Sequence, residues 1–296
     1  MPLKPAQELF ASALAGGYAL GYFESWNLES LQGVLDAAEA TRSPVIIGFN
    51  GEFLTHPERI ERERIPLYAA LGRAAAEAAS VPCALFFNEC ASDDYLQQAV
   101  SAGFNMVMLA DATASGEAYQ RRVGDLVKLA HAHGAAVEAE IDELPSGDTG
   151  SVSTAHSSLT DPDAAARFIA ATGIDLLSVS VGNVHVLTHG ARQLDLERLA
   201  AIRQRVALPL GLHGGTGIAP DSLRAAIRMG VVKVAYGTYL KQRYLAALRQ
   251  ALDTPEINPH KLLGLGGAED VMVCGRRAVR EAVLERIELL GCCGRA

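Results

Sequence analysis

Histidines and carboxylates at the ends of short apolar runs are the residues of this sequence best suited to chemistry. His185 follows one such run and His213 ends another, and other runs contain or lead into Glu89, Glu138 and Glu140. Two histidines and one carboxylate can hold a zinc ion with one coordination position left open. The same ligands in a facial arrangement can hold Fe(II) or another divalent ion. A single histidine in such a place is more often a hydrogen-bonded structural residue, so the expected metal site depends on all three groups meeting.

Two glycine-rich stretches have the composition of an anion site. HGGTGIAPDSLRAAI (213–227) and YGTYLKQRYL (236–245) each place small residues just before a helical pattern. Backbone N–H groups at a helix N-terminus favour negative charge. Glycine after a strand often only makes a turn, but two such stretches in succession predict a phosphate site. Its candidate residues are Gly214, Gly215, Thr216, Gly217, Tyr236, Gly237 and Thr238.

Between these candidate residues, apolar runs and Ala-rich helical patterns alternate regularly along the chain. The runs predict strands over residues 17–23, 43–49, 81–87, 104–110, 135–141, 175–181, 208–213 and 231–236. Helical patterns lie between them, and several begin with an acidic residue and end with glycine. Strands that alternate with helices form parallel βαβ units.

Eight such units in about 250 residues suit an α/β fold of the (β/α)₈ TIM-barrel type. We predict this barrel with an additional C-terminal helical tail from about residue 255, in a single domain spanning residues 1–296. A doubly wound open sheet is the alternative. In a barrel, chemistry takes place at the C-terminal ends of the strands, which is where the histidines, carboxylates and glycine-rich stretches fall.

Composition narrows the class of protein. The 296 residues carry a formal charge of −8, which argues against nucleic-acid binding through phosphate neutralisation. No apolar run reaches the roughly 18 residues of a membrane span, and the first ten residues lack the apolar region of a signal peptide. The five cysteines form no CxxC pair, which predicts reduced thiols in a cytoplasmic protein.

Six stretches spread over nearly the whole chain carry a resemblance to a known family. They are GYALGYFESWNLESLQGVLDAAEATRSPVII, VEAEI, LTDPDAAARFIAATGIDLLSVSVGNVH, LPLGLHGGTGI, VVKVAYGTYL and AVREAVLERIELLGCCGRA. In this order they resemble the class II, metal-dependent ketose-bisphosphate aldolases of the fructose- and tagatose-bisphosphate type. The resemblance implies a TIM barrel, lyase chemistry at a divalent metal, a sugar-phosphate substrate and a homodimer or higher homo-oligomer.

Residue by residue, the resemblance implies that His185 and His213 are two of the family's three zinc-ligating histidines. Glu138 and Glu140 match paired acidic positions on the fifth strand, the second of which is linked to an alternative metal position. The GGTG stretch at 214–217 matches a backbone cradle for the substrate phosphate. Thr238 is similar to a threonine of the second phosphate loop.

The chain departs from the family pattern at the end of the third strand. Where the family has Asp-His, this chain has Asn88-Glu89. The Asp is the family's proton donor and acceptor, and the His is its third zinc ligand. Glu24 stands where Asn is usual on the first strand, and Ala235 replaces an Asn that helps to hold the ketose phosphate. Several changes around one pocket indicate a redesigned site.

Glu89 can take the place of the missing histidine, so the predicted metal ligands are His185, His213 and Glu89. Zinc is the expected ion, and the added carboxylate makes the harder ions Mn²⁺, Fe²⁺ and Mg²⁺ alternatives. Asn88 does not titrate. It can hydrogen-bond a substrate hydroxyl but cannot act as a general acid or base.

Another group must then carry the proton. The candidates are Asp111, Glu24, Glu140 and Tyr236. Asp111 is favoured because it stands directly after the fourth strand, while a carboxylate buried beside others has a raised pKa that suits a general acid. The predicted catalytic residues are Asn88, Asp111 and Glu140.

We therefore predict a metal-dependent aldolase that makes or breaks a carbon–carbon bond next to a carbonyl. Its substrate is expected to be a phosphorylated sugar or a related ketose or keto acid, rather than the usual fructose bisphosphate. Two alternatives stay open: an isomerase or epimerase using the same enolate chemistry, and a non-catalytic sugar-phosphate-binding protein descended from an aldolase. The expected partner is a small molecule, not a nucleic acid or a membrane.

Overall fold

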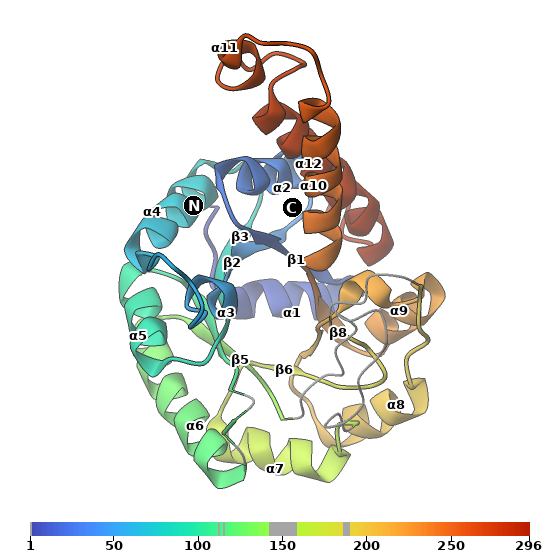
Figure 1. The fold of residues 1–296 in the computed structure, drawn as a ribbon. Helices are drawn as coiled ribbons and strands as arrows, with labels where there is room; N and C mark the ends of the chain where they lie inside the picture. Colours follow the sequence, from blue (N-terminus) through green and yellow to red (C-terminus); the bar gives the residue numbers. More distant parts are fainter. Residues whose placement is uncertain (1, 112, 115, 142–158, 186–189) are drawn as a thin grey trace.

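The computed structural model describes residues 2–111, 113–114, 116–141, 159–185 and 190–296. Within these ranges eight parallel strands pair in sequence order, and the eighth pairs with the first to close a barrel (Figure 1). The strands are β1 (Leu20–Ser25), β2 (Val45–Asn50), β3 (Cys83–Cys90), β4 (Met106–Leu109), β5 (Ala136–Glu140), β6 (Leu176–Ser178), β7 (Leu210–Leu212) and β8 (Val231–Tyr236). The predicted TIM barrel is confirmed, and the β1–β8 pairing excludes the open sheet.

Helices alternate with the strands and surround them (Figure 1). They are α1 (Ala6–Gly16), α2 (Leu28–Thr41), α3 (Gly51–Leu54), α4 (Ile65–Ala78), α5 (Asp93–Ala102), α6 (Gly116–Ala132), α7 (Pro162–Thr172), α8 (Leu196–Arg205), the 3₁₀ turn η1 (Gly215–Gly217), α9 (Pro220–Arg228), α10 (Thr238–Leu252), α11 (Pro259–Leu262) and α12 (Val271–Leu290). The predicted C-terminal helical tail is confirmed, with α12 packed against α2 and α10. None of the described helices has the length and apolar character needed to cross a bilayer.

The start of the first strand differs from the expectation because a helix precedes it. Gly17 has a left-handed φ of 64° and ends α1, so β1 begins at Leu20 rather than at residue 17. The chain before α1 pairs with Cys83 at the start of β3, and α1 lies across the barrel in Figure 1. This helix therefore covers the N-terminal ends of the strands, opposite the end where a barrel places its chemistry.

Alternation along the strands decides which side chains enter the barrel. In a central layer, Lys233 Nζ lies 2.9 Å from Glu138 Oε1 and over the rings of Tyr22 and Phe86. Two positions further along the same four strands, the next layer contains Glu24, Asn88, Glu140 and Ala235. The barrel therefore has a buried polar centre directly below its C-terminal rim.

A close helix–helix contact holds the tail against the barrel. A Cβ on Gly33 of α2 would lie 2.5 Å from the carbonyl oxygen of Arg276 and 3.0 Å from the Cβ of Val279. Beside this contact, Arg276 forms a two-point ion pair with Asp36 at 2.6 and 2.7 Å. The absence of a side chain at Gly33 thus lets α12 approach the backbone of α2.

Gly33→Ala is expected to lower the free energy of unfolding by about 1–3 kcal/mol, because the new methyl group overpacks the α2–α12 contact. Gly124→Ala in α6 is the matched control, since the nearest atom to its Cβ would be 4.0 Å away. That change should raise the free energy of unfolding by up to about 1 kcal/mol through helix propensity. Urea unfolding followed by circular dichroism measures both, and a neutral or stabilising Gly33→Ala would contradict the close contact.

Candidate active site

The third strand turns two consecutive side chains toward the C-terminal end of the barrel. β3 extends to Cys90, so Asn88 and Glu89 lie within the strand rather than after it. The register with β4 shifts between Phe87 and Cys90, and Glu89 has a left-handed φ of 49°. An irregularity of this kind re-aims a side chain, at a cost of about 1–2 kcal/mol for a residue other than glycine. Asn88 keeps the inward position set by alternation, and the irregularity brings Glu89 to the same site.

The structure brings the three predicted metal ligands together. Glu89 Oε1 lies 2.7 Å from Nδ1 of His213 and 3.2 Å from Nε2 of His185, and these two nitrogens are 3.4 Å apart. Ligand atoms about 2.0–2.1 Å from a tetrahedral zinc ion lie roughly 3.3 Å from one another. Glu89 Oε1 is buried, yet it has hydrogen-bond geometry with none of the described residues. A cation shared by the three atoms would satisfy this oxygen, so the donor set fits a divalent ion.

Glu89 is ionised between the two histidines. Burial by itself would raise the pKa of its carboxyl group, but His185 and His213 in their protonated forms hold that pKa well below its usual range, and Glu89 in turn favours the protonated form of both histidines. The side chain is only 8% exposed. The negative charge therefore lies inside the barrel, facing two imidazoles.

Below these three residues, a second buried carboxylate orients His213. Glu138 Oε1 accepts hydrogen bonds from His213 Nε2 at 2.7 Å, Lys233 Nζ at 2.9 Å and Ser178 Oγ at 2.5 Å. Burial would raise the pKa of Glu138, but Lys233 and His213 lower it to about 2. An ionised carboxylate can only accept, so His213 donates through Nε2 and turns Nδ1 toward Glu89. Partners of this kind fix the tautomer of a metal-binding histidine.

Asn183 brings the two histidine loops together. Its side-chain oxygen accepts a hydrogen bond from Val181 N at 2.9 Å, and its amide nitrogen donates to the carbonyl of His213 at 3.0 Å. The chain after β6 is thereby tied to the end of β7, which places His185 beside His213.

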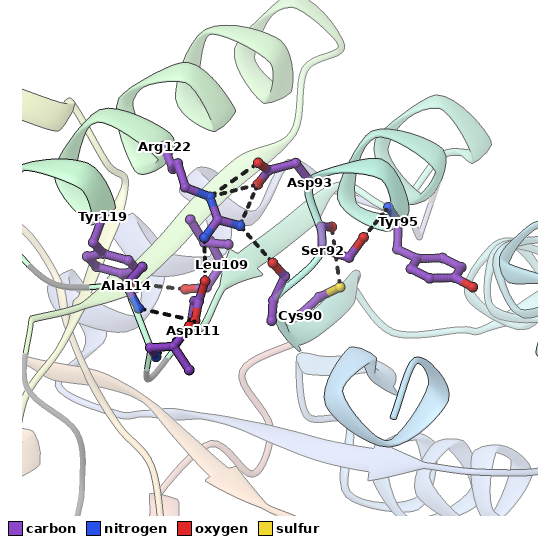
Figure 2. A network of polar contacts seen from close by, with 11 residues as sticks. Cys90, Ser92, Asp93, Tyr95, Leu109, Asp111, Ala114, Tyr119 and Arg122 are labelled. Atoms are coloured by element: carbon purple, nitrogen blue, oxygen red, sulfur yellow. Dashed lines mark hydrogen bonds and ion pairs between the residues drawn. The ribbon is translucent and has the colours of Figure 1, made fainter. Parts of the chain in front are cut away.

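Asp111 is held by a network at the ends of β3 and β4 (Figure 2). Arg122 of α6 lies between Asp93 and Asp111, and its Nη1 is 2.5 Å from Asp111 Oδ2. The other oxygen of Asp111 accepts a hydrogen bond from Thr113 N at 2.9 Å. Hydrogen bonds from Thr113 and the ion pair with Arg122 lower the pKa of Asp111. Both carboxylate oxygens of Asp111 are thus engaged in contacts with Thr113 and Arg122. The role of Asp111 in proton transfer stays a prediction.

Glu140 lies two residues beyond Glu138 on β5, in the layer at the C-terminal rim. Burial raises the pKa of Glu140; the nearby His213 and His185 oppose this shift, and Glu89 adds to it. Glu140 thus lies on the same end of the barrel as the three candidate ligands but outside their cluster. A carboxyl group with a raised pKa can hold a proton that an ordinary carboxylate has already released.

Tyr236 occupies a different place from the other candidates. Its ring stacks on Phe23 with centroids 5.6 Å apart, and the guanidinium of Arg286 from α12 lies 5.8 Å from the ring centroid. Burial raises the pKa of its phenol. The side chain therefore packs between the barrel and the tail, on the outward face of β8.

The two glycine-rich stretches lie side by side after β7 and β8. η1 follows His213, α10 begins at Thr238, and Tyr239 N lies 3.4 Å from Thr216 Oγ1. Gly214 has a left-handed φ of 67°, and a Cβ there would collide with the backbone of Val184. The predicted phosphate-binding loops thus meet next to His213, as an anion site in a barrel requires.

A carboxylate of the protein borders this region. Glu24 occupies the space that a Cβ on Gly237 would need. Its Oε1 lies 2.5 Å from Lys241 Nζ, which is also 3.8 Å from the centroid of the Phe53 ring. Burial raises the pKa of Glu24, while Lys241 opposes that shift. A phosphate bound beside Gly237 would therefore meet a carboxylate and an ammonium group together.

Asn50, Lys233 and Lys241 are among the residues of this site that sequence reasoning missed. Lys233 did leave a signal, because a lysine inside the buried strand VVKVAY requires an anionic partner. Asn50 ends the apolar strand β2 much as Asn88 comes near the end of β3, and the two face each other in the β2–β3 register. Lys241 reaches the site from α10, and no local pattern indicates this.

Comparisons with known proteins agree with this fold. The family described as fructose-bisphosphate aldolase class-II matches residues 4–295. The protein YdjI of Escherichia coli K12 is 31% identical over 94% of both chains. The crystal structure of the YdjI aldolase matches 99% of both chains with a TM-score of 0.81.

Two further proteins extend the comparison. The fructose-bisphosphate aldolase of Thermus caldophilus is 31% identical over 98% of both chains. The fructose-bisphosphate aldolase of Campylobacter jejuni is 20% identical with a TM-score of 0.75, covers 99% of this chain and 97% of its own, and shares the fold. Because the family match spans nearly every residue, the chain belongs to the class II fructose-bisphosphate aldolase family.

Proposed function

We propose that this protein is a metal-dependent aldolase in which His185, His213 and Glu89 bind the metal. Family membership supports aldolase-type lyase chemistry, and the family generally depends on a divalent ion. The observation that carries the proposal is the convergence of one atom from each of the three side chains, all within 4.8 Å of one another. The proposed substrate is a phosphorylated ketose or a related keto acid.

A divalent ion held by these residues would act as a Lewis acid that polarises a substrate carbonyl and stabilises the charge developing beside it. Zinc fits the two imidazoles and one carboxylate. Mn²⁺, Fe²⁺ and Mg²⁺ are the alternatives because Glu89 supplies a hard oxygen ligand.

Proton transfer is assigned to Glu140. Cleavage requires a base for the proton of the hydroxyl group that becomes the aldehyde, and an acid to protonate the carbon left behind. Glu140 lies in the inward-facing layer at the C-terminal rim, and its raised pKa suits the acid step. Asn88 is buried, and its Oδ1 has no partner among the described residues, so we assign it to accepting a hydrogen bond from a substrate hydroxyl.

The first test measures bound metal by plasma mass spectrometry and then cleavage of a panel of ketose phosphates and hydroxy-keto acids. The wild type should hold about one equivalent of divalent ion per chain, and His185→Ala/His213→Ala should lose both the metal and the cleavage activity. His131→Ala/His133→Ala is the matched control, because these exposed histidines lie at the end of α6.

Two outcomes would overturn the aldolase assignment. A wild type that takes up none of Zn²⁺, Mn²⁺, Fe²⁺ or Mg²⁺ would remove the metal site. Metal-dependent deuterium exchange next to a carbonyl, without cleavage of any compound in the panel, would identify an isomerase or epimerase instead.

Glu140→Gln is expected to lower kcat by about 10²–10⁴, the usual contribution of a general acid–base group. Its metal content should stay at the wild-type level. Asp111→Asn is the matched carboxylate-to-amide control and should lower kcat less than about tenfold, because Asp111 is engaged with Arg122. A large loss of kcat in Asp111→Asn together with a small loss in Glu140→Gln would instead assign proton transfer to Asp111.

The Glu24–Lys241 pair should control how tightly a phosphate binds. Glu24→Gln removes the competing carboxylate, so inorganic phosphate should inhibit about 3–10-fold more strongly, the effect of roughly 0.7–1.4 kcal/mol of charge interaction. Lys241→Met should weaken inhibition by a similar factor. The measurement is the Ki of inorganic phosphate for each variant, and unchanged values in both would place the phosphate elsewhere.

A further inference from the structure

Building on the proposed metal site, we propose that Asn50 is a positioning residue that holds Glu89 as a one-oxygen ligand. Asn50 is the last residue of β2, and its Nδ2 donates to Glu89 Oε2 at 2.6 Å. Both residues are buried. The contact is therefore shielded from water, where a hydrogen bond to a charged group is strongest.

The orientation of the Asn50 amide is determined at both of its atoms. Its Oδ1 accepts a hydrogen bond from Phe53 N at 3.2 Å, which caps the short helix α3. A carboxylate can only accept, so the amide nitrogen has to face Glu89. The two contacts require the same orientation of the amide.

This contact gives the two carboxylate oxygens of Glu89 different roles. Oε2 is engaged by Asn50, and Oε1 is the atom that faces His185 and His213. A carboxylate free to rotate could present either oxygen or both to an ion. With Asn50 in place, Glu89 presents Oε1 alone.

The residue type at position 50 supports a role beyond capping. Serine, threonine and aspartate cap helices as well as asparagine does. Among these residues, only asparagine has two separate atoms for these contacts, one that accepts from Phe53 N and one that donates to an ionised carboxylate, whereas a hydroxyl would have to do both through one oxygen. Asn50 is therefore suited to the cap and to Glu89 at the same time.

The test replaces Asn50 by serine, which keeps a capping oxygen and removes the amide donor. Co²⁺ is the probe, because its visible absorption spectrum reports the ligands and geometry of the bound ion directly, without an activity assay. Competition with a chelator gives the affinity. Asn50→Ser should bind Co²⁺ about 10–100-fold more weakly, as is typical when a partner of a metal ligand is lost, and its spectrum should change.

Asn27→Ser is the matched control. Asn27 also caps a helix, accepting from Ser30 N, and its amide nitrogen donates to Tyr244 Oη at 2.8 Å rather than to a candidate ligand. This variant should keep the wild-type affinity and spectrum. In a Glu89→Ala background, Asn50→Ser should cause no further loss, because residues that act through one another are not additive.

The possible results separate this inference from the proposed function. Equal Co²⁺ affinity and identical spectra for wild type and Asn50→Ser would overturn the role of Asn50 alone. A further loss in the Glu89→Ala background would show that Asn50 acts by another route and would also overturn it. A wild type that binds no Co²⁺ would overturn the proposed metal site, and the role of Asn50 with it. If circular dichroism shows that Asn50→Ser does not fold, Asn50→Thr keeps the cap and carries the same expectation.

Discussion

The ionised carboxylate of Glu138, buried at the centre of the barrel, is the group on which the candidate site depends. One of its oxygens accepts hydrogen bonds from Lys233, His213 and Ser178. Lys233 is completely buried, and removal of one partner from a buried ion pair typically costs about 3–5 kcal/mol. Because His213 shares the same oxygen, the orientation of this imidazole is coupled to an ion pair that the barrel interior has to retain. The ion pair that stabilises the core of the barrel therefore also orients a residue of the candidate site.

Among the described residues, glutamates outnumber lysines inside the barrel near its C-terminal end. Glu24, Glu89 and Glu140 lie at this end and Glu138 lies just below it, while Lys241 pairs with Glu24 and Lys233 pairs with Glu138. Burial raises the pKa of Glu24 and Glu140. A divalent cation would offset part of this charge, which is a physical reason for the site to take one up.

The residues at the end of β3 form a consistent set despite their departure from the family pattern. Glu89 supplies a candidate ligand where the resemblance implies that a histidine is usual, and Asn50 donates a hydrogen bond to its second oxygen. Asn88 places an amide where the resemblance implies a carboxylate, while Glu140 has a carboxyl group with a raised pKa on β5. Ligand and proton carrier are therefore proposed on different strands, whereas in the family pattern they are neighbours.

Much of the fold follows from local sequence patterns. Apolar runs that alternate with helical periodicity predict eight βα units, and parallel strands bring their C-terminal ends to one side. That reasoning is sufficient to expect His185, His213 and Glu89 near one another, and it also places Asn88 and Glu140 at the rim. These expectations depend only on which strand carries each residue and near which end.

The remaining features depend on contacts between distant parts of the chain. The left-handed backbone at Glu89 accompanies a shift in its register with β4, which the residues of β3 alone do not specify. Asp111 is engaged by Arg122 because α6 packs beside the ends of β3 and β4, and Lys241 meets Glu24 because β8 closes onto β1. The sequence by itself therefore determined the barrel and the end at which its polar groups gather. Only the tertiary structure decided which of these groups pair, because pairing depends on strand register and helix packing between segments far apart in the chain.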